Sequence, residues 1–422
     1  SYVQVRGIAV RKAGVGGDIS NSTETLIAET SITDTVKEGI VASGSQNSTI
    51  QGNTIANTGA DAITAAVNSP VEVSGLRVLD NVISNSGVRL AGVTVTNLPP
   101  AKSMGAIVSG PNSVVERNSI TNSSYNGITA GRQSQVRQNH IENACAIFSD
   151  CGAIYLFGSP NNSVVESNTI RALPGRVDGI PLAKSHTVGV YLDELSSGVQ
   201  VIGNSVTGAM FGIQLHNAFN NIVSNNTLYG NSTYELFLQE QSRVLHAGGD
   251  TYGNSVTGNL FFSTGSSTSV AQYTTFTDTS DFATYDNNRY SGLLNKHVAR
   301  EGWSGGERPY TFSAWQAASV NGVSRNIEPN GSLVNPAYAT YVVNGTNLVP
   351  AGAGPLKGWS AWAESTSSPV VTLNPCDGVD CLTMQSGGSP SLLASPYSPC
   401  RRAHGIGCPS TFDPRAITCE ST

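Results

Sequence analysis

The sequence predicts an all-β fold, a right-handed parallel β-helix (a solenoid) followed by a small C-terminal β-sandwich-like or irregular tail. One observation is a short β-branched run that recurs along the chain, for example at 113–116 and 163–166. Another is that no stretch before residue 300 sustains the 3.6-residue period of an amphipathic helix. The third is a repeated step of the form Asn-x-Ile/Val/Leu, found at Asn53, Asn81, Asn118, Asn139, Asn168, Asn204, Asn226 and Asn254.

The spacing of this step defines the repeating unit. Asn118 and Asn139 are 21 residues apart, and the longer intervals are explained by loops of roughly 7 or 15 residues added to the same unit. A unit of this length with two or three short strands is typical of one rung of a parallel β-helix, which adds about 4.8 Å to the stack. We expect the asparagines to stack at one corner of the rungs rather than to contact a ligand.

The composition argues against nucleic acid and membrane partners. The 422 residues carry a formal net charge of −6, so no basic stripe is available to neutralise phosphates. No run approaches about 18 consecutive apolar residues, the length that crosses a bilayer. Only 12% of the residues are charged, but 39% are hydrophobic in regular alternation, which favours a folded chain over a disordered one.

Three segments are expected along the chain. Residues 1–300 form the catalytic or binding β-helix, 301–354 hold capping strands and a linker, and 355–422 form a Cys-rich, β-rich tail. The first residues already read as a strand, so we expect a processed product that has lost any signal peptide.

The seven cysteines favour an oxidising environment. Cys145 and Cys151 lie close together and the other five crowd the tail, and neither group has the spacing of a zinc site. Disulfides are therefore favoured, which predicts a secreted, extracellular protein with at least one thiol left unpaired or intermolecular. A bridge between Cys145 and Cys151 would fix the loop that carries Asp150. No metal or other cofactor is predicted.

The candidate working surface lies within 139–217, where three similar segments recur: DCGAIYLFG (150–158), GVYLDE (189–194) and GIQLHN (212–217). Side chains alternate between the two faces of a strand. When the segments are aligned, the inward positions form two core columns, Ile154/Val190/Ile213 and Leu156/Leu192/Leu215. The outward positions form two further columns, Tyr155/Tyr191/Gln214 and Phe157/Asp193/His216. Aromatic rings beside an acid and a histidine are suited to a sugar-binding cleft.

These segments resemble the pectate-lyase-like right-handed β-helix superfamily over residues 1–300. They are most similar to β-helical glycoside hydrolases of the family 141 type, which include xylan- and fucose-acting enzymes. The resemblance implies that the acid before the G-A-I-Y run and the acid that closes the G-V-Y-L-D run are catalytic, namely Asp150 and Asp193. FSAWQAASVNG (312–322) looks like the strand that commonly follows such a helix. The tail is similar to the front half of carbohydrate-binding β-sandwich modules, which implies an incomplete module of this kind.

Glycoside hydrolysis requires two carboxyl groups that face one bond, one protonated and one ionised. We expect Asp193, next to the apolar Phe157, to have a raised pKa and to act as the acid. Asp150 would have to fold back from its corner towards Asp193. The structural alternatives are a turn-forming role for Asp150 and an exposed strand-end charge for Asp193.

A second group of residues is predicted to bind the substrate. The outward rings of Tyr155 and Tyr191 would stack on sugars, the alternative being ordinary surface ladders. Glu194 and His216 adjoin the predicted acid, although either could be a solvated surface group. Lys184 and His186 come from the insertion 171–187, which we expect to form a wall over the substrate.

Three functions remain open at this point. The first is a secreted glycoside hydrolase that acts on a polysaccharide. The second is a polysaccharide lyase or epimerase, which needs a cation or metal to neutralise a uronate carboxylate and a base to remove the adjacent proton. The DPHD motif of alginate epimerases is absent from the sequence. The third is a non-catalytic glycan-binding protein, tailspike-like or adhesive, and the expected assembly is a monomer or homotrimer.

Overall fold

The computed structural model describes residues 2–333 except for 66–72, 89–104, 159–160, 176–185, 242–249, 264–267, 277 and 293–296. Beyond residue 333 it describes only the backbone of four strands, β38 (Thr340–Asn344), β39 (Asn347–Pro350), β40 (Val370–Cys376) and β41 (Val379–Gln385). These strands form an antiparallel sheet in the order β39-β38-β40-β41. The predicted 355–422 tail therefore contains a β-hairpin, and its cysteine side chains lie outside the described residues.

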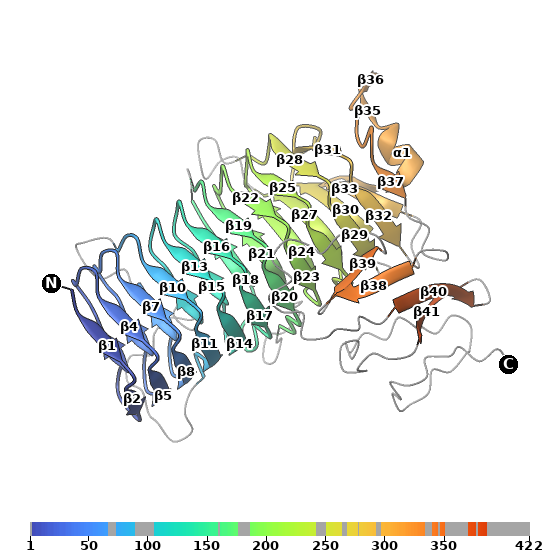
Figure 1. Cartoon of the computed structure of the whole chain (residues 1–422). Coiled ribbons are helices and arrows are strands. Elements are labelled where there is room, and N and C mark those ends of the chain that lie inside the picture. The colour runs from blue at the N-terminus through green and yellow to red at the C-terminus, as the bar shows by residue number, and fades with distance from the viewer. Residues whose placement is uncertain are drawn as a thin grey trace.

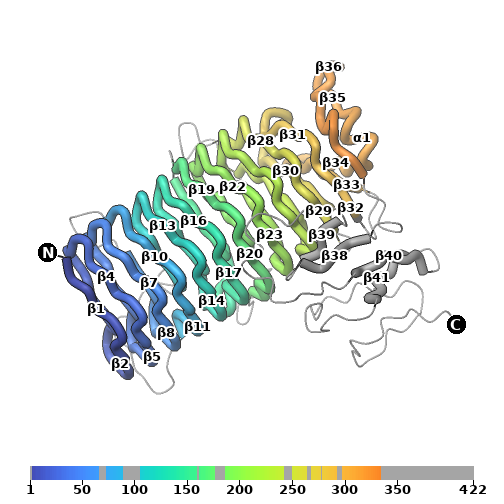
Figure 2. Tube along the Cα trace, in the orientation of Figure 1, coloured from blue at the N-terminus to red at the C-terminus, as the bar shows by residue number. Residues whose placement is uncertain are grey.

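The solenoid is a right-handed parallel β-helix, as predicted, in which each rung contributes one strand to each of three parallel sheets (Figure 1). The rungs stack in chain order from the N-terminus (Figure 2). The first sheet contains β1 (Gln4–Arg6), β4 (Leu26–Ala28), β7 (Thr49–Gln51), β10 (Arg77–Leu79), β13 (Val114–Glu116), β16 (Gln135–Arg137), β19 (Val164–Glu166), β22 (Gln200–Ile202), β25 (Ile222–Ser224), β28 (Asn254–Thr257) and β31 (Ala283–Asp286).

The second and third sheets follow the same order. The second contains β2 (Ala9–Arg11), β5 (Ser31–Thr35), β8 (Thr54–Thr58), β11 (Val82–Ser86), β14 (Ser119–Ser123), β17 (His140–Glu142), β20 (Thr169–Arg171), β23 (Ser205–Thr207), β26 (Thr227–Tyr229), β29 (Leu260–Ser263), β32 (Arg289–Gly292) and β37 (Ser332–Leu333). The third contains β3 (Gly17–Asp18), β6 (Ile40–Val41), β9 (Ile63–Thr64), β12 (Ile107–Val108), β15 (Ile128–Thr129), β18 (Cys151–Leu156), β21 (Thr187–Leu192), β24 (Phe211–His216), β27 (Tyr234–Glu240), β30 (Thr268–Thr274), β33 (His297–Trp303) and the antiparallel β34 (Gly306–Thr311). Strand β33 crosses residue 300, the expected end of the solenoid, and β37 still pairs with β32.

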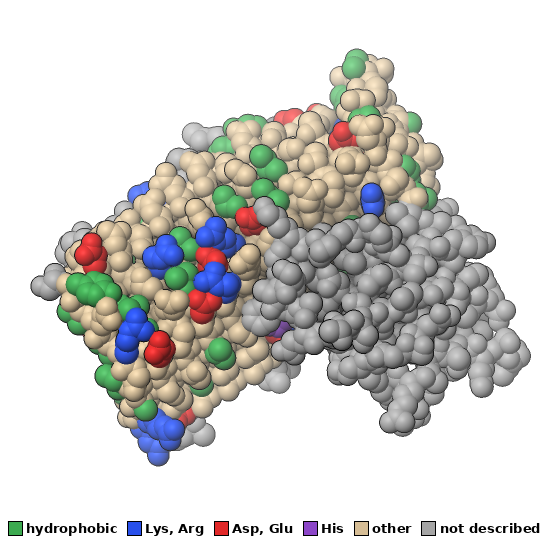
Figure 3. All heavy atoms as spheres, in the orientation of Figure 1, with side chains coloured by type: hydrophobic (Ala, Val, Ile, Leu, Met, Phe, Trp, Pro, Cys, Tyr) green, Lys and Arg blue, Asp and Glu red, His purple; other side chains and the backbone are tan. Residues whose placement is uncertain are grey.

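Charged side chains gather on the outer face of the early rungs of the first sheet (Figure 3). Arg117 bonds to Asp80 (Nε–Oδ1 2.6 Å) and to Glu116, and Arg137 lies 2.9 Å from the other Glu116 oxygen. The hydrogen bond from Arg117 lowers the pKa of Asp80, which keeps this carboxyl group charged. These two arginines are therefore neutralised in place by carboxylates.

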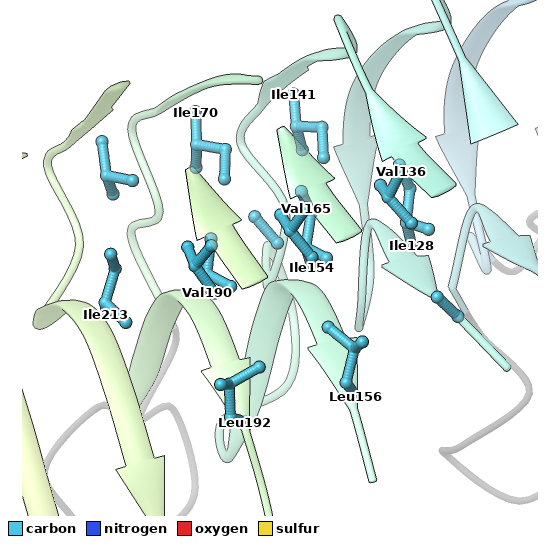
Figure 4. Packing of buried hydrophobic residues seen from close by; sticks show 14 of the residues in the cluster. Ile128, Val136, Ile141, Ile154, Leu156, Val165, Ile170, Val190, Leu192 and Ile213 are labelled. Carbon is cyan, nitrogen blue, oxygen red and sulfur yellow. The ribbon is translucent and has the colours of Figure 1, made fainter. Parts of the chain in front are cut away.

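The register keeps the predicted core columns inside the solenoid. Ile154 pairs with Val190, which pairs with Ile213, and all three side chains are fully buried (Figure 4). Leu156, Leu192 and Leu215 form the second column in the same way. Burying one such side chain contributes about 1.5–3 kcal/mol, and a one-residue slip would expose every member of a column. The alternation of the sequence thus fixes which side chains of the third sheet face outward.

A buried asparagine ladder occupies one corner of the rungs. In each step, the backbone N–H and Nδ2 of one asparagine both donate to Oδ1 of the next, as from Asn139 to Asn168 at 3.0 Å. The structural role predicted for the repeated asparagines is confirmed for Asn53, Asn81, Asn118, Asn139, Asn168, Asn204 and Asn226.

The placement predicted for Asn254 is wrong. Asn226 donates to Asn259, not to Asn254, and Asn254 accepts from Asn221 (Nδ2–Oδ1 3.1 Å) in a separate short ladder. The aliphatic pattern missed Asn259 because the third residue of its step is the aromatic Phe261.

The ladder ends at Glu328. Asn288 donates from its backbone N–H and from Nδ2 to the two Glu328 oxygens at 3.1 and 2.7 Å, and the Tyr290 hydroxyl donates to Oε1 at 2.7 Å. Glu328 is fully buried, and burial raises the pKa of its carboxyl group in spite of these bonds.

The segment 312–322 does not form the single strand that its resemblance implied. Residues Phe312–Gln316 form the short helix α1, and β35 (Ser319–Val320) and β36 (Val323–Ser324) form a hairpin after it. The Thr311 hydroxyl caps the helix by accepting from the Ala314 N–H. The helical turn directs Trp315 onto Tyr285 and Tyr310, with ring centroids 5.5 and 5.2 Å away, so that a fully buried indole covers the end of the core. In an extended strand, the side chains on either side of Trp315 would point to the opposite face from the indole.

Asp61 places a carboxyl group at a corner that Asn126 fills in a later rung. Asp61 accepts from the Gly105 N–H at 2.8 Å and bonds to Thr64, just as Asn126 accepts from the Gly152 N–H at 2.9 Å and donates to Thr129. Burial raises the pKa of Asp61 to about 7 against the lowering effect of its hydrogen bonds.

Asp61→Asn is expected to stabilise the protein above neutral pH. Because the folded-state pKa of Asp61 lies above its unfolded value, its contribution to stability is full below about pH 4 and is lost as pH rises through 7. At pH 8 the variant should gain about 2–4 kcal/mol in free energy of unfolding, and near pH 4 it should gain little. Urea unfolding at both pH values measures this. The reciprocal variant Asn126→Asp should lose stability at pH 8, and equal stability of Asp61→Asn and the wild type at pH 8 would contradict the expectation.

Candidate functional site

The outer face of the third sheet brings the predicted site residues together. Tyr155 pairs with Tyr191, Tyr191 with Gln214 and Gln214 with Phe237, as the sequence columns predicted for the first three. Asp193 follows the end of β21, next to His216 at the end of β24. Strands β18, β21 and β24 therefore present one acid and several polar and aromatic side chains on the same face.

Asp193 lies in the middle of a hydrogen-bond network. His216 Nδ1 donates to its Oδ1 at 2.8 Å, and the Tyr155 hydroxyl donates to its Oδ2 at 2.9 Å. Burial acts to raise the pKa of Asp193, but the bonds from His216, the Glu194 N–H and Tyr155 outweigh it and hold the pKa below its usual range. The expectation of a raised pKa is therefore wrong: three donors fix the carboxylate, whereas Phe157 is 55% exposed and provides little apolar cover.

Asp150 occupies the corner immediately before β18. Its backbone is left-handed (φ 59°), its N–H donates to the His186 carbonyl at 2.8 Å, and its own carbonyl accepts from the Tyr125 hydroxyl at 2.7 Å. Cys145 and Cys151 form a disulfide on either side of it, with Cα atoms 6.0 Å apart. The backbone of Asp150 is thus held from three directions while its side chain remains 74% exposed.

His186 connects Asp150 to the outward column. Its Nδ1 lies 3.3 Å from Asp150 Oδ1 and its Nε2 lies 2.7 Å from Gln214 Oε1, so each ring nitrogen faces an oxygen. Two acceptors suit the doubly protonated ring. Burial acts to lower the pKa of His186, but the bonds to Asp150 and Gln214 and the nearby carboxylates raise it overall.

The two predicted catalytic acids act on the same neighbours. The negative charges of both Asp150 and Asp193 add to burial in raising the pKa values of Tyr155 and Tyr191 well above 10, and they help to raise that of Tyr125 to about 12. Both carboxylates also favour protonated His186. Both carboxylates therefore lie within electrostatic range of the same three tyrosines, whose phenols stay neutral.

Tyr155 and Tyr191 differ in what they offer to a ligand. Their rings meet edge to face with centroids 5.5 Å apart, and Tyr155 is only partly buried. Tyr191 is 3% exposed because it packs in an outer aromatic cluster that includes Phe211 and Phe237. The prediction of an open sugar-stacking face is wrong for Tyr191, since neighbouring rungs supply large rings that cover it.

Three other predicted site residues have different outcomes. His216 lies against Asp193 and also lies 3.2 Å from Gln241 Oε1 through Nε2. Glu194 is partly buried and contributes its backbone N–H to Asp193. Lys184 lies outside the described residues, as does most of the insertion that was expected to form a wall.

Sequence reasoning gave no role to Tyr125 or Gln239. Gln214 Nε2 donates to Gln239 Oε1 at 2.9 Å, which orients the Gln214 oxygen towards His186. Alignment of one further segment, YELFLQE, would have placed Gln239 in register with His216. Tyr125 lies in a corner between the second and third sheets, where no repeated pattern marks it. Within the described residues, no group of three or more His, Cys, Asp or Glu side chains is arranged to hold a metal ion, and no helix is long and apolar enough to cross a membrane.

Comparison with known proteins gives one family match and several structural likenesses. A family model for the right handed beta helix region matches residues 1–176. A solved glycoside hydrolase aligns at 16% identity with a TM-score of 0.42, over 50% of this chain and 37% of that one. A mutant tailspike protein of E. coli bacteriophage HK620 in complex with a pentasaccharide aligns at 12% identity with a TM-score of 0.46, over 72% of this chain and 58% of that one. A mannuronic acid specific polysaccharide family 6 lyase from human gut microbiota aligns at 10% identity with a TM-score of 0.40, over 79% of this chain and 91% of that one. The chain thus spans about a third of the glycoside hydrolase, and no curated protein sequence matches significantly.

Proposed function

We propose that this right-handed β-helix protein is a secreted glycoside hydrolase that cleaves a polysaccharide on the outer face of its third sheet, with Asp150 and Asp193 as the catalytic carboxyl groups. The observation that carries the proposal is the contrast between the two acids. Asp193 is held ionised by three donors, whereas Asp150 is exposed and paired with a histidine of raised pKa. Glycoside hydrolysis needs an ionised group and a proton donor, and the His186 imidazolium beside Asp150 can be that donor.

In this mechanism Asp193 is the ionised partner. Its carboxylate either attacks the anomeric carbon or activates a water, and its charge stabilises the oxocarbenium-like transition state. The bonds from His216 and Tyr155 keep it oriented, so little reorganisation is needed during the reaction.

Asp150 and His186 together supply the proton. The imidazolium of His186 lies 3.3 Å from Asp150 Oδ1, so a proton can be held between them beside the bond to be cleaved. Transfer to the glycosidic oxygen lets the leaving sugar depart as an alcohol. The partly exposed ring of Tyr155 and the exposed ring of Phe157 provide apolar faces for the sugars on either side.

A panel of neutral and acidic polysaccharides tests the proposal. The protein is incubated with each, and reducing ends are measured together with the absorbance of unsaturated products. The expected result is new reducing ends without unsaturation. The absence of products from every polysaccharide would contradict catalysis and would leave glycan binding, which binding measurements on the same panel would detect.

The raised pKa of His186 favours one alternative, a polysaccharide lyase or epimerase. The His186 imidazolium could neutralise the carboxylate of a uronic acid, which is what abstraction of the adjacent proton requires. Unsaturated products from an acidic polymer, or a change in its uronate composition without cleavage, would establish this reaction in place of hydrolysis.

The pH dependence of hydrolysis should follow the two shifted groups. Because the pKa of Asp193 is lowered, kcat/KM should persist below pH 4 before protonation abolishes it. Because the pKa of His186 is raised, activity should persist above pH 6.5 and fall as the imidazolium loses its proton. His186→Gln should lower kcat about 10–100-fold and remove this alkaline limb. An alkaline limb unchanged in His186→Gln would contradict the role given to His186.

A further inference from the structure

The outward column that contains Asp193 continues towards the C-terminal end of the solenoid. His216 pairs with Gln239, Gln239 with Tyr273 and Tyr273 with Gly302, on the neighbouring strands β24, β27, β30 and β33 (Figure 1). Tyr273 is therefore three rungs from Asp193, or about 14 Å along the stack. The advance per rung is close to the length of one pyranose residue in an extended chain.

A hollow of about 360 Å³ lies at the end of this column. Its walls include Tyr234, Phe237, Tyr273 and Trp303, and its polar edge is the ion pair between Arg300 and Glu307 at 2.8 Å. Its volume falls within the usual range for small-ligand sites. In this column the amide of Gln239 lies between His216 and Tyr273.

The chemistry of the hollow suits an uncharged sugar. Aromatic faces stack on the C–H groups of a pyranose ring. The charge of Arg300 is balanced by Glu307, so this ion pair adds no net charge to the edge of the hollow. Gly302 adds no side chain beside the Tyr273 ring, where a Cβ would lie only 3.0 Å from the ring edge.

We propose that this hollow is a distal subsite, in which Tyr273 and Trp303 hold a neutral sugar residue of the same polysaccharide chain whose cleavage occurs at Asp193. The inference rests on the proposed function, since one extended polysaccharide chain would occupy both the hollow and the cleavage site at Asp193. It predicts that long oligosaccharides bind more tightly than short ones and that the hollow is responsible for the difference.

Calorimetric titration of the full chain with oligosaccharides of two lengths tests the subsite. The probes are xylohexaose, cellohexaose and a mannuronate hexamer, each beside its trisaccharide, with Asp193→Asn as the background so that no probe is consumed. At least one neutral hexasaccharide should bind, and Trp303→Ala should raise its Kd about tenfold while the trisaccharide Kd changes less than about twofold. Trp303→Phe, which keeps an aromatic face, should restore most of the affinity.

The controls separate a local effect from a general one. Tyr2→Ala removes an exposed ring (63%) at the other end of the solenoid and should change neither Kd. Tyr273→Leu provides a second test if Trp303→Ala does not fold. The proposal is overturned if neither variant weakens the hexasaccharide, if both lengths weaken equally, if no neutral hexasaccharide binds, or if only the mannuronate hexamer does.

The outcome for hydrolysis is read separately from the polysaccharide panel. Products from a neutral polymer together with unchanged hexasaccharide binding in Trp303→Ala would overturn only the subsite. Length-dependent binding that Trp303→Ala abolishes, without any products, would overturn only the hydrolase.

Discussion

Asp193→Asn is expected to lower kcat about 10³-fold on any polysaccharide of the test panel from which the wild-type protein releases reducing ends. The amide keeps the shape of the side chain but has no charge to stabilise an oxocarbenium-like transition state. One of its two acceptor oxygens is replaced by an NH2 donor, so either His216 or Tyr155 can no longer donate to that atom. Steady-state rates of reducing-end release measure the effect, with KM expected to change little because binding does not require the charge.

A matched control for this substitution is Asp34→Asn. Asp34 has left-handed backbone (φ 59°) on the outer surface, where Asn57, Asn85 and Asn122 occupy the equivalent places in later rungs. Asn57 donates to Asp34 Oδ1, and an amide oxygen can accept this bond equally well. Asp34→Asn should therefore keep full activity. Retention of more than about a tenth of wild-type kcat by Asp193→Asn would exclude Asp193 as a catalytic carboxylate.

Asn139→Ala is expected to lower the free energy of unfolding by about 3–5 kcal/mol. The Asn139 amide donates to the Val115 carbonyl at 2.9 Å and to Asn168 at 3.0 Å, and its oxygen accepts two bonds from Asn118. All these groups are buried, so their loss leaves donors and acceptors without water to replace the amide. Urea unfolding followed by circular dichroism measures the change.

Asn143→Gly provides the comparison for this ladder substitution. Asn143 also bonds to an asparagine of the preceding rung, Asn122, but on the exposed surface, and glycine accepts its left-handed backbone (φ 56°). A loss of no more than about 1 kcal/mol is expected there. Similar decreases in the free energy of unfolding of the two variants would mean that burial does not determine how much the ladder hydrogen bonds stabilise the protein.

The fold could be predicted from sequence because each rung repeats the same pattern of alternating apolar residues and a corner asparagine. Ile154, Val190 and Ile213 were placed in one column by alternation alone, and the register confirmed it. Repetition failed where a rung changed its chemistry. At Asn259 an aromatic residue replaced the aliphatic one, and at Trp315 a non-repeating segment had to cover the end of the core.

The site was only partly predictable because its properties depend on contacts between rungs. The sequence placed His216 beside Asp193, but it did not reveal that Tyr155 and the Glu194 N–H also donate to that carboxylate and lower its pKa. It indicated outward tyrosines, but the burial of Tyr191 follows from Phe211 and Phe237 on later strands. The pairing of Asp150 with His186 follows from the same register, since Cys151 pairs with Thr187, but the sequence columns were aligned only within the strands and did not extend to these corners.

The asparagine ladder that ends at Glu328 gives the solenoid a direction. Each internal asparagine donates two hydrogen bonds to the next asparagine and accepts two from the previous one on its Oδ1. At this corner, one rung could therefore replace another. Only the last position must accept without donating, and a carboxyl group at Glu328 does so. Duplication or deletion of a whole rung would therefore leave both ends chemically complete. A change in the number of rungs would thus alter the length of the outer face of the third sheet without requiring a new end for the ladder.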